Sequence, residues 1–234
     1  MHVTHVDELK RQAGFAAVDR YVRAGTCIGL GTGTTARWAV ARVGERVAAG
    51  EEIVAVATSA ATAQQCRELD IPLVAYGDRP IDVAIDGADE VAADWALTKG
   101  GGGALFREKA VALLARTFVV IVTPEKLVER LGAFPTPLEV VPFALPYVHA
   151  RVAARYPTAA VRRRMTAGTP YLTDNGNALL DCAFGAIDDP RALDTALRTI
   201  HGVVATGLFC DLTDAVIVAA PDGVRELSPP PARA

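Results

Sequence analysis

Residues 27–48 read CIGLGTGTTARWAVARVGERVA, an apolar segment followed by a glycine-rich turn and a helical pattern. The glycines of the turn are Gly29, Gly31 and Gly33. A strand, a tight turn and a helix in this order form the repeating unit of α/β folds, in which helices cover a mostly parallel sheet. This stretch therefore predicts the fold class of the chain.

The turn also carries hydroxyl groups where the helix is expected to begin. Thr32, Thr34 and Thr35 lie there, and the N–H groups at a helix start favour an anion such as phosphate. A dinucleotide fingerprint is excluded, because its third glycine would fall at position 34, where Thr34 stands. Ordinary capping of the helix by a threonine is the alternative to a phosphate site.

The alternation of strands and helices continues on both sides of this stretch. A helix is expected over residues 7–24, ending at Gly25. Further apolar strands are expected over residues 52–59, 71–76, 81–85, 117–123 and 215–219. Together they predict a Rossmann-like, mostly parallel sheet with helices on both faces, whose ligands bind at the carboxyl ends of the strands.

The texture of the sequence changes at Pro135, where residues 134–147 hold four prolines and mark a domain boundary. The order strand, helix, strand, strand, helix, strand that follows predicts a smaller ferredoxin-like α+β domain. Its hairpin turn is expected at Asn175-Gly176. The predicted domains are a Rossmann-like domain of residues 1–134 and 208–234 and a smaller domain of residues 135–207.

Acidic residues follow the predicted strand 81–85. The sequence there is DGADE, in which Asp86 and Asp89 bracket Gly87 and Ala88. Asp-Gly pairs are common in plain turns, which is the alternative reading. The position at the carboxyl end of a strand favours a ligand site.

A lysine and four glycines come next, in the stretch KGGGGALFREK of residues 99–109. Glycines let a backbone bend and let a ligand approach closely, so Lys99 and Gly100–Gly103 predict a binding loop. In the helix that follows, Glu108 shares a face with apolar residues. A solvated or paired glutamate is the alternative to a catalytic base.

The composition of the chain argues against several classes of function. The chain has 234 residues and a net charge of −3, which gives no general attraction to nucleic acid or to an anionic membrane. The four cysteines hold no CxxC pair and the four histidines no ligand-spaced set, so no metal site is expected. No secretory signal or membrane-length apolar run is read, and we expect a cytoplasmic protein with reduced thiols.

The sequence supports separate predictions for three further segments. Arg162–Arg164 are expected to form a solvated strand edge. Residues 228–234 (SPPPARA) are expected to be disordered. Lys126 falls early in a helix expected after Pro124, close to the predicted ligand edge of the sheet, with a solvated lysine as the alternative.

The threonine turn, the acidic residues and the lysine-glycine loop together indicate one type of reaction. A hydroxyl-rich helix start suits phosphate, and a carboxylate base beside acids and a lysine suits proton abstraction next to a carbonyl. The lysine and the N–H groups of the loop would stabilise the developing oxyanion. The substrate class that this combination predicts is a phosphorylated sugar.

Six motifs occur in order between Gly29 and Phe209: GLGTGTTA, DGADE, KGGGGALFREK, EKLVERLGAFPTPLEVVP, TDNGNALLDC and GVVATGLF. In this combination the sequence resembles the type A ribose-5-phosphate isomerase family, with Thr34 where a serine is frequent. The resemblance implies aldose-ketose interconversion of D-ribose 5-phosphate and D-ribulose 5-phosphate through an enediolate, in the non-oxidative branch of the pentose phosphate pathway. It implies no metal and no cofactor.

The resemblance also implies roles for single residues. Glu108 would be the base that moves a proton between C1 and C2, while Asp86 and Lys99 would assist ring opening and proton movement. The residues implied to line the substrate are Thr32, Gly33, Thr34, Thr35, Asp86, Gly87, Ala88, Asp89, Lys99, Gly100, Gly101, Gly102 and Lys126, with Lys10 as a further phosphate candidate. The family also implies a homo-oligomer, dimer or tetramer, with the smaller domain as lid and contact.

Two other functions are weighed against this one. A non-catalytic sugar-phosphate sensor of a transcription regulator would need a DNA-reading helical module, and the residues before Cys27 lack basic character. A CoA-transferase-like enzyme with Glu108 as nucleophile would form a covalent acyl adduct.

Overall fold

The computed structural model describes residues 5–228, and the chain divides into two compact units. The first unit is drawn from Met1–Ala88, Arg107–Leu127 and Leu212–Ala234, and the second from Asp89–Phe106 and Val128–Asp211. Residues 89–106, 128–134 and 208–211 thus group with the α+β unit, unlike in the predicted division of the chain. The predicted domain roles stay predictions, and the segment expected to be disordered lies, beyond residue 228, outside the described residues.

A six-stranded sheet with the order β16-β15-β6-β3-β1-β2 forms the centre of the first unit. Its strands are β1 (Cys27–Leu30), β2 (Val54–Ala57), β3 (Val83–Gly87), β6 (Phe118–Val122), β15 (Ala215–Ala220) and β16 (Gly223–Leu227). Every neighbouring pair is parallel except the hairpin of β15 with β16. The predicted mostly parallel sheet is confirmed.

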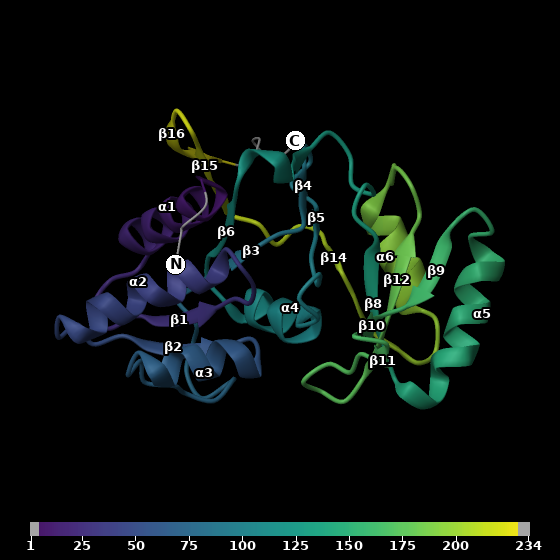
Figure 1. Ribbon diagram of the computed structural model, residues 1–234, viewed down its shortest axis with the longest axis horizontal. Helices are drawn as coiled ribbons and strands as arrows, with labels where there is room; N and C mark the ends of the chain where they lie inside the picture. Colours follow the sequence, from purple (N-terminus) through teal and green to yellow (C-terminus); the bar gives the residue numbers. More distant parts are fainter. Residues whose placement is uncertain (1–4, 229–234) are drawn as a thin grey trace. The chain divides into compact units, whose positions relative to one another are not determined.

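Four helices belong wholly or mainly to this unit (Figure 1): α1 (His5–Tyr21), α2 (Ala36–Ala48), α3 (Ala60–Glu68) and α4 (Leu105–Leu114). Ile28 and Leu30 of β1 face the side of the sheet where they pack in one core with α1 and α2. Gly29 faces the other side, where a Cβ would lie 2.3 Å from Cγ1 of Val111 in α4. Helices therefore cover both faces, and Gly29 lets α4 approach closely.

Two of the strands predicted for this unit differ in the structure: one does not form, and the other is longer than expected. Residues 71–76 form no strand, and only Leu73 makes a single bridge, to Ala55. Pro72 has no N–H to donate to a ladder, which explains why pairing stops there. In contrast, β3 extends through Gly87, because Asp86 and Gly87 pair with β6. Asp86 thus lies inside the strand and not after it.

The prediction of a helix after Pro124 is also wrong. Only one 3-10 turn forms, η1 (Pro124–Lys126), and the chain then extends into β7 (Leu127–Val128). The hydroxyl of Thr123 makes no cap to the turn and donates instead to the Glu125 carboxylate. Without a cap, a single turn gains too little from hydrogen bonding to propagate.

An antiparallel sheet with the order β13-β8-β12-β9 forms the core of the second unit. Its elements are β8 (Thr136–Val140), η2 (Pro142–Ala144), α5 (Leu145–Arg155), β9 (Ala160–Arg163), β12 (Ala178–Ala183), α6 (Pro190–Arg198) and β13 (Val203–Thr206). Val148 and Val152 of α5 and Leu197 of α6 pack with Leu138 and Leu180 of the sheet. This order of strands and helices is the predicted ferredoxin-like arrangement.

The second unit also holds short strands outside that sheet. They are β4 (Glu90–Ala92), β5 (Leu97–Thr98), β14 (Leu208–Phe209) and the hairpin β10 (Met165–Thr166) with β11 (Thr169–Pro170). β5 pairs antiparallel with both β4 and β14. Among the helices of residues 5–228, none has the length and apolar character of a membrane span.

The TDNGN motif has a structural role in the second unit. Thr173, Asn175 and Asn177 all donate side-chain hydrogen bonds to Oε1 of Glu139, at 2.9, 3.0 and 2.9 Å. Glu139 lies fully buried on β8. A buried carboxylate needs such donors, so the motif ties the turn at Gly176 to the centre of the sheet.

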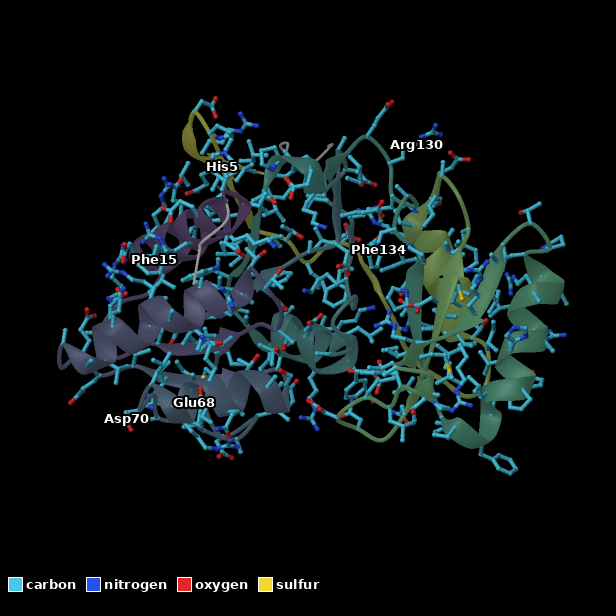
Figure 2. The ribbon with its side chains drawn as sticks, in the orientation of Figure 1. His5, Phe15, Glu68, Asp70, Arg130 and Phe134 are labelled. Carbon is cyan, nitrogen blue, oxygen red and sulfur yellow. The ribbon has the colours of Figure 1, made fainter. Side chains whose placement is uncertain are left out.

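We expect Glu139→Gln to lower the free energy of unfolding by about 1–3 kcal/mol, because a neutral amide oxygen accepts more weakly than a carboxylate and the new NH₂ would be buried at the place of Oε2, which has no hydrogen-bond partner among the described residues. Urea unfolding followed by circular dichroism measures this loss. The control is Glu68→Gln, an exposed position on α3 (Figure 2), which should change stability by less than about 0.5 kcal/mol. Equal stability of the two variants would contradict the role of Glu139.

Candidate active site

Backbone donors meet the carboxylate of Asp86 at the end of β3. The Asp86 side chain is buried, and its Oδ1 accepts hydrogen bonds from the N–H of Gly87 at 2.7 Å and the N–H of Thr32 at 3.1 Å. The second bond joins the turn after β1 to the neighbouring strand. Asp86 and the glycine-threonine turn, both predicted for the site, therefore lie together in the first unit.

Gly31 makes this approach possible. A Cβ built on Gly31 would lie 2.0 Å from Oδ1 and 2.1 Å from Cγ of Asp86. No side chain fits in that space, because contacts below 3.0 Å are not tolerated. The glycine that the sequence assigns only to a turn is thus the residue that admits the Asp86 carboxylate.

The Thr32 hydroxyl takes part in an internal network. Its Oγ1 lies 2.8 Å from Oγ1 of Thr58 and 3.2 Å from Oγ1 of Thr62. Thr62 in turn donates to the carbonyl of Gly31 at 2.8 Å. Thr58 and Thr62 were not predicted, although hydroxyl residues directly after β2, the strand beside β1, are a signal that could have found them.

The remaining residues of the turn lead into α2. Gly33 and Thr34 are exposed, and Thr35 precedes the helix without a side-chain cap. The capping alternative is therefore wrong for Thr35. Lys10 of α1 donates from Nζ to Oγ1 of Thr34 at 3.1 Å, which brings a cation to the start of α2.

Lys126 ends the turn η1 in the same unit. Burial raises the pKa of its neighbour Glu125, but a hydrogen bond from Thr123, the backbone, and the charges of Lys126 and Lys10 outweigh burial and bring that pKa below its ordinary value. Both lysines thus act on one carboxylate.

Glu108 lies in the first turn of α4 and is 4% exposed. The partial positive charge of a helix start stabilises a carboxylate at such a position. The reading of Glu108 as a solvated glutamate is therefore wrong, since burial excludes it. Its predicted role as a base stays a prediction.

The backbone of Lys99 is fixed within the second unit. Its N–H donates to the carbonyl of Gly207 at 2.8 Å, and a Cβ on Gly207 would lie 2.3 Å from the Lys99 carbonyl oxygen. The Lys99 side chain is buried, with Nζ 5.5 Å from the centre of the Phe209 ring. Gly207 lies between β13 and β14.

Asp89 and the glycine loop also lie together in the second unit. Oδ2 of Asp89 accepts a hydrogen bond from the N–H of Gly101 at 2.8 Å. Gly100 has a φ of +98°, a conformation that side chains disfavour. Gly101 and Gly102 are exposed at the tip of this loop.

The predicted site residues thus form two groups, each described within its own unit. The first unit holds the 32–35 turn, Asp86–Ala88, Glu108, Lys126 and Lys10, and the second holds Asp89, Lys99 and Gly100–Gly102. Within residues 5–228 no group of three or more His, Cys, Asp and Glu side chains is arranged to hold a metal ion. The side chains present are those of acid/base and anion chemistry.

Comparison with known proteins assigns the chain to a protein family. Residues 54–223 match the family described as ribose 5-phosphate isomerase A (phosphoriboisomerase A). The chain belongs to this family. The ribose-5-phosphate isomerase A of Roseiflexus sp. (strain RS-1) is 45% identical over 231 residues, which cover 97% of this chain and 99% of that protein. That of Methanothermobacter thermautotrophicus is 42% identical, covering 94% of this chain and 97% of that protein.

Solved structures of family members agree with the fold. Ribose 5-phosphate isomerase A from Methanocaldococcus jannaschii shares 36% identity with a TM-score of 0.90, covering 95% of this chain and 99% of that chain. A D-ribose-5-phosphate isomerase solved in complex with phospho-erythronic acid shares 38% identity with a TM-score of 0.92, covering 96% and 100%. The fold predicted from the family resemblance is confirmed.

We expect Gly31→Ala to lower the free energy of unfolding by about 1–3 kcal/mol, because the new methyl group overlaps the Asp86 carboxylate. In an Asp86→Gly background the same change should cost less than about 0.5 kcal/mol, since the overlapping atoms Oδ1, Cγ and Cβ of Asp86 are all gone. Urea unfolding of the four proteins of this cycle measures the coupling. Additive effects would show that Gly31 does not act through Asp86.

Proposed function

We propose that this chain interconverts D-ribose 5-phosphate and D-ribulose 5-phosphate as an aldose-ketose isomerase of the non-oxidative pentose phosphate pathway. The observation that carries the proposal is the match to the isomerase family over nearly the whole chain. The buried carboxylates of Glu108 and Asp86 suit the required proton transfers. No observation favours a sensor or an acyl carrier over this activity.

In the proposed mechanism Glu108 is the base. Its carboxylate removes the proton from C2 of the open-chain aldose, and the electron pair moves to form a C1–C2 double bond with negative charge on O1. Returning the proton to C1, with a proton moved from O2 to O1, gives the ketose. Asp86 and Lys99 assist ring opening and the movement of protons among the sugar oxygens.

The N–H groups of the glycine loop and the Lys99 ammonium are proposed to stabilise the enediolate. Donors fixed before the reaction lower the barrier because they need no reorganisation when charge develops. Asp89, Gly87, Ala88 and the loop from Gly100 to Gly102 would line the sugar. Phospho-erythronic acid, which is bound in a solved relative, combines a phosphate with a carboxylate whose two oxygens share charge as in an enediolate.

The phosphate is proposed to bind at the start of α2. The exposed Gly33 and Thr34, Thr35 and the two lysines Lys10 and Lys126 provide N–H, hydroxyl and ammonium donors there. Thr32 supports this turn through its internal bonds more than by a free hydroxyl. The reaction uses no metal and no cofactor in this proposal.

We further propose a cytoplasmic homo-oligomer that contacts through the predicted domain of residues 135–207. Phe143 is 96% exposed, and Tyr147 of α5 follows it at 50%. Exposed aromatic side chains of this kind are enriched at protein interfaces. The overall negative charge of the chain fits a small-molecule substrate and not nucleic acid.

We expect Glu108→Gln to lower kcat by about 10²- to 10⁴-fold, because the amide cannot accept the proton. The assay follows ketose formation from ribose 5-phosphate in the presence of EDTA, with Glu68→Gln as the control that keeps full activity. Wild-type turnover in Glu108→Gln would refute the role of Glu108. Wild-type product that forms only after metal is added would refute the proposed reaction.

Lys10→Met should raise KM for ribose 5-phosphate about 10-fold, equivalent to about 1.4 kcal/mol, with kcat within about threefold. The phosphate does not react, so a contact with it stabilises ground state and transition state alike. Steady-state kinetics separates the two constants, and Arg67→Met on α3 serves as the exposed control. A lower kcat at constant KM would place Lys10 near the reacting carbons instead.

A further inference from the structure

Arg164 follows β9 and contacts the glycine loop, although the sequence places it in a solvated basic edge. Its Nη1 donates to the carbonyl of Gly100 at 2.8 Å and to that of Gly101 at 3.0 Å. The side chain is only 14% exposed. All of these groups belong to the second unit.

The guanidinium is itself held in a fixed orientation. Nε of Arg164 donates to Oδ2 of Asp181 at 2.9 Å, and Nη2 donates to Oδ1 of the same carboxylate. The backbone N–H of Arg164 donates to the carbonyl of Leu179 at 2.9 Å. Two parallel hydrogen bonds to one carboxylate fix the plane of a guanidinium. The remaining nitrogen, Nη1, is therefore held in one orientation toward the loop.

These contacts set the direction of two successive peptide groups. In a trans peptide the C=O and the N–H point in opposite directions. With the carbonyls of Gly100 and Gly101 turned toward Arg164, the N–H groups of Gly101 and Gly102 point away from it. The N–H of Gly101 does so, since it donates to Asp89 at 2.8 Å.

A glycine run would otherwise leave these peptides free to rotate, because glycine accepts many backbone conformations. Tyr171 adds a contact on the same side, with Oη 3.4 Å from the Gly102 carbonyl. The loop is therefore held through its carbonyls by side chains of the α+β unit. The N–H of Gly101 faces Asp89, and the N–H of Gly103 donates to the carbonyl of Gly100 at 2.9 Å.

We propose that Arg164 is a positioning residue for the isomerase reaction, which orients the N–H of Gly102 toward the sugar oxygens, while the N–H of Gly101 stays bonded to Asp89. This inference rests on the proposed function, in which the loop meets the enediolate. Arg164 touches no reacting atom in this role. It determines instead whether the donors of the loop are in place before charge develops.

Arg164→Met is the test, because methionine removes the donors and keeps much of the length. We expect kcat to fall about 10- to 100-fold, with KM for ribose 5-phosphate within about threefold, since fixed donors matter most in the transition state. The affinity for phospho-erythronic acid should fall by a similar factor. The affinity for inorganic phosphate should not change, whereas the melting temperature should fall, because Asp181 loses its ion-pair partner.

Two further variants make the experiment specific. Arg163→Met removes a neighbouring, exposed arginine of β9 and should behave as the wild type. Arg164→Lys keeps the charge but lacks two parallel donors, so it should remain impaired in kcat. Arg164→Lys also supplies the decisive measurement if Arg164→Met does not fold.

The outcomes separate this inference from the proposed function. An inactive wild type would refute the isomerase activity itself. An active wild type with Arg164→Met and Arg164→Lys equally active would overturn the role of Arg164. Equal losses for phospho-erythronic acid and inorganic phosphate would also overturn it, because the damage would then extend beyond the loop.

Discussion

A buried carboxylate must be met by hydrogen-bond donors, and this requirement at Asp86 shapes the first unit. The N–H of Thr32 and the N–H of Gly87 reach the same oxygen. Thr32 can do so only because β1 and β3 are neighbours and Gly31 leaves the necessary space. The same turn then places Thr34 at the start of α2, beside Lys10. One constraint thus arranges both Asp86 and the turn that is proposed to bind the phosphate.

The glycine loop of the second unit follows the same logic in a different form. Asp89 accepts a loop N–H, and Arg164 donates to loop carbonyls. Consecutive glycines usually indicate freedom of the backbone. Here the absence of Cβ atoms lets charged side chains approach the peptides closely and remove that freedom. The loop gains a defined backbone conformation without side chains of its own.

Buried acids in this chain have distinct roles that only their partners reveal. Glu139 accepts three side-chain donors, and Glu90 accepts from Thr98 and from the N–H groups of Gly132 and Phe134. These two carboxylates hold turns and strands together. Glu108 lies instead at a helix start that follows a glycine loop. Burial alone does not mark a catalytic acid, because structural acids are equally buried.

The sequence by itself determined the parallel sheet, the ferredoxin-like unit and the family, because apolar strands buried on both faces and contiguous motifs are local signals. Only the tertiary structure decided which side chains form hydrogen bonds with segments far away in the sequence. The hydrogen bonds of Thr58 and Thr62 with Thr32 join separate segments of the chain, and Arg164, predicted to lie at a solvated edge, contacts a loop 64 positions earlier. It also decided that Pro72 ends the sheet and that η1 stays a single turn. Local patterns encode which face a residue occupies, but hydrogen bonds between remote segments exist only once the chain has folded.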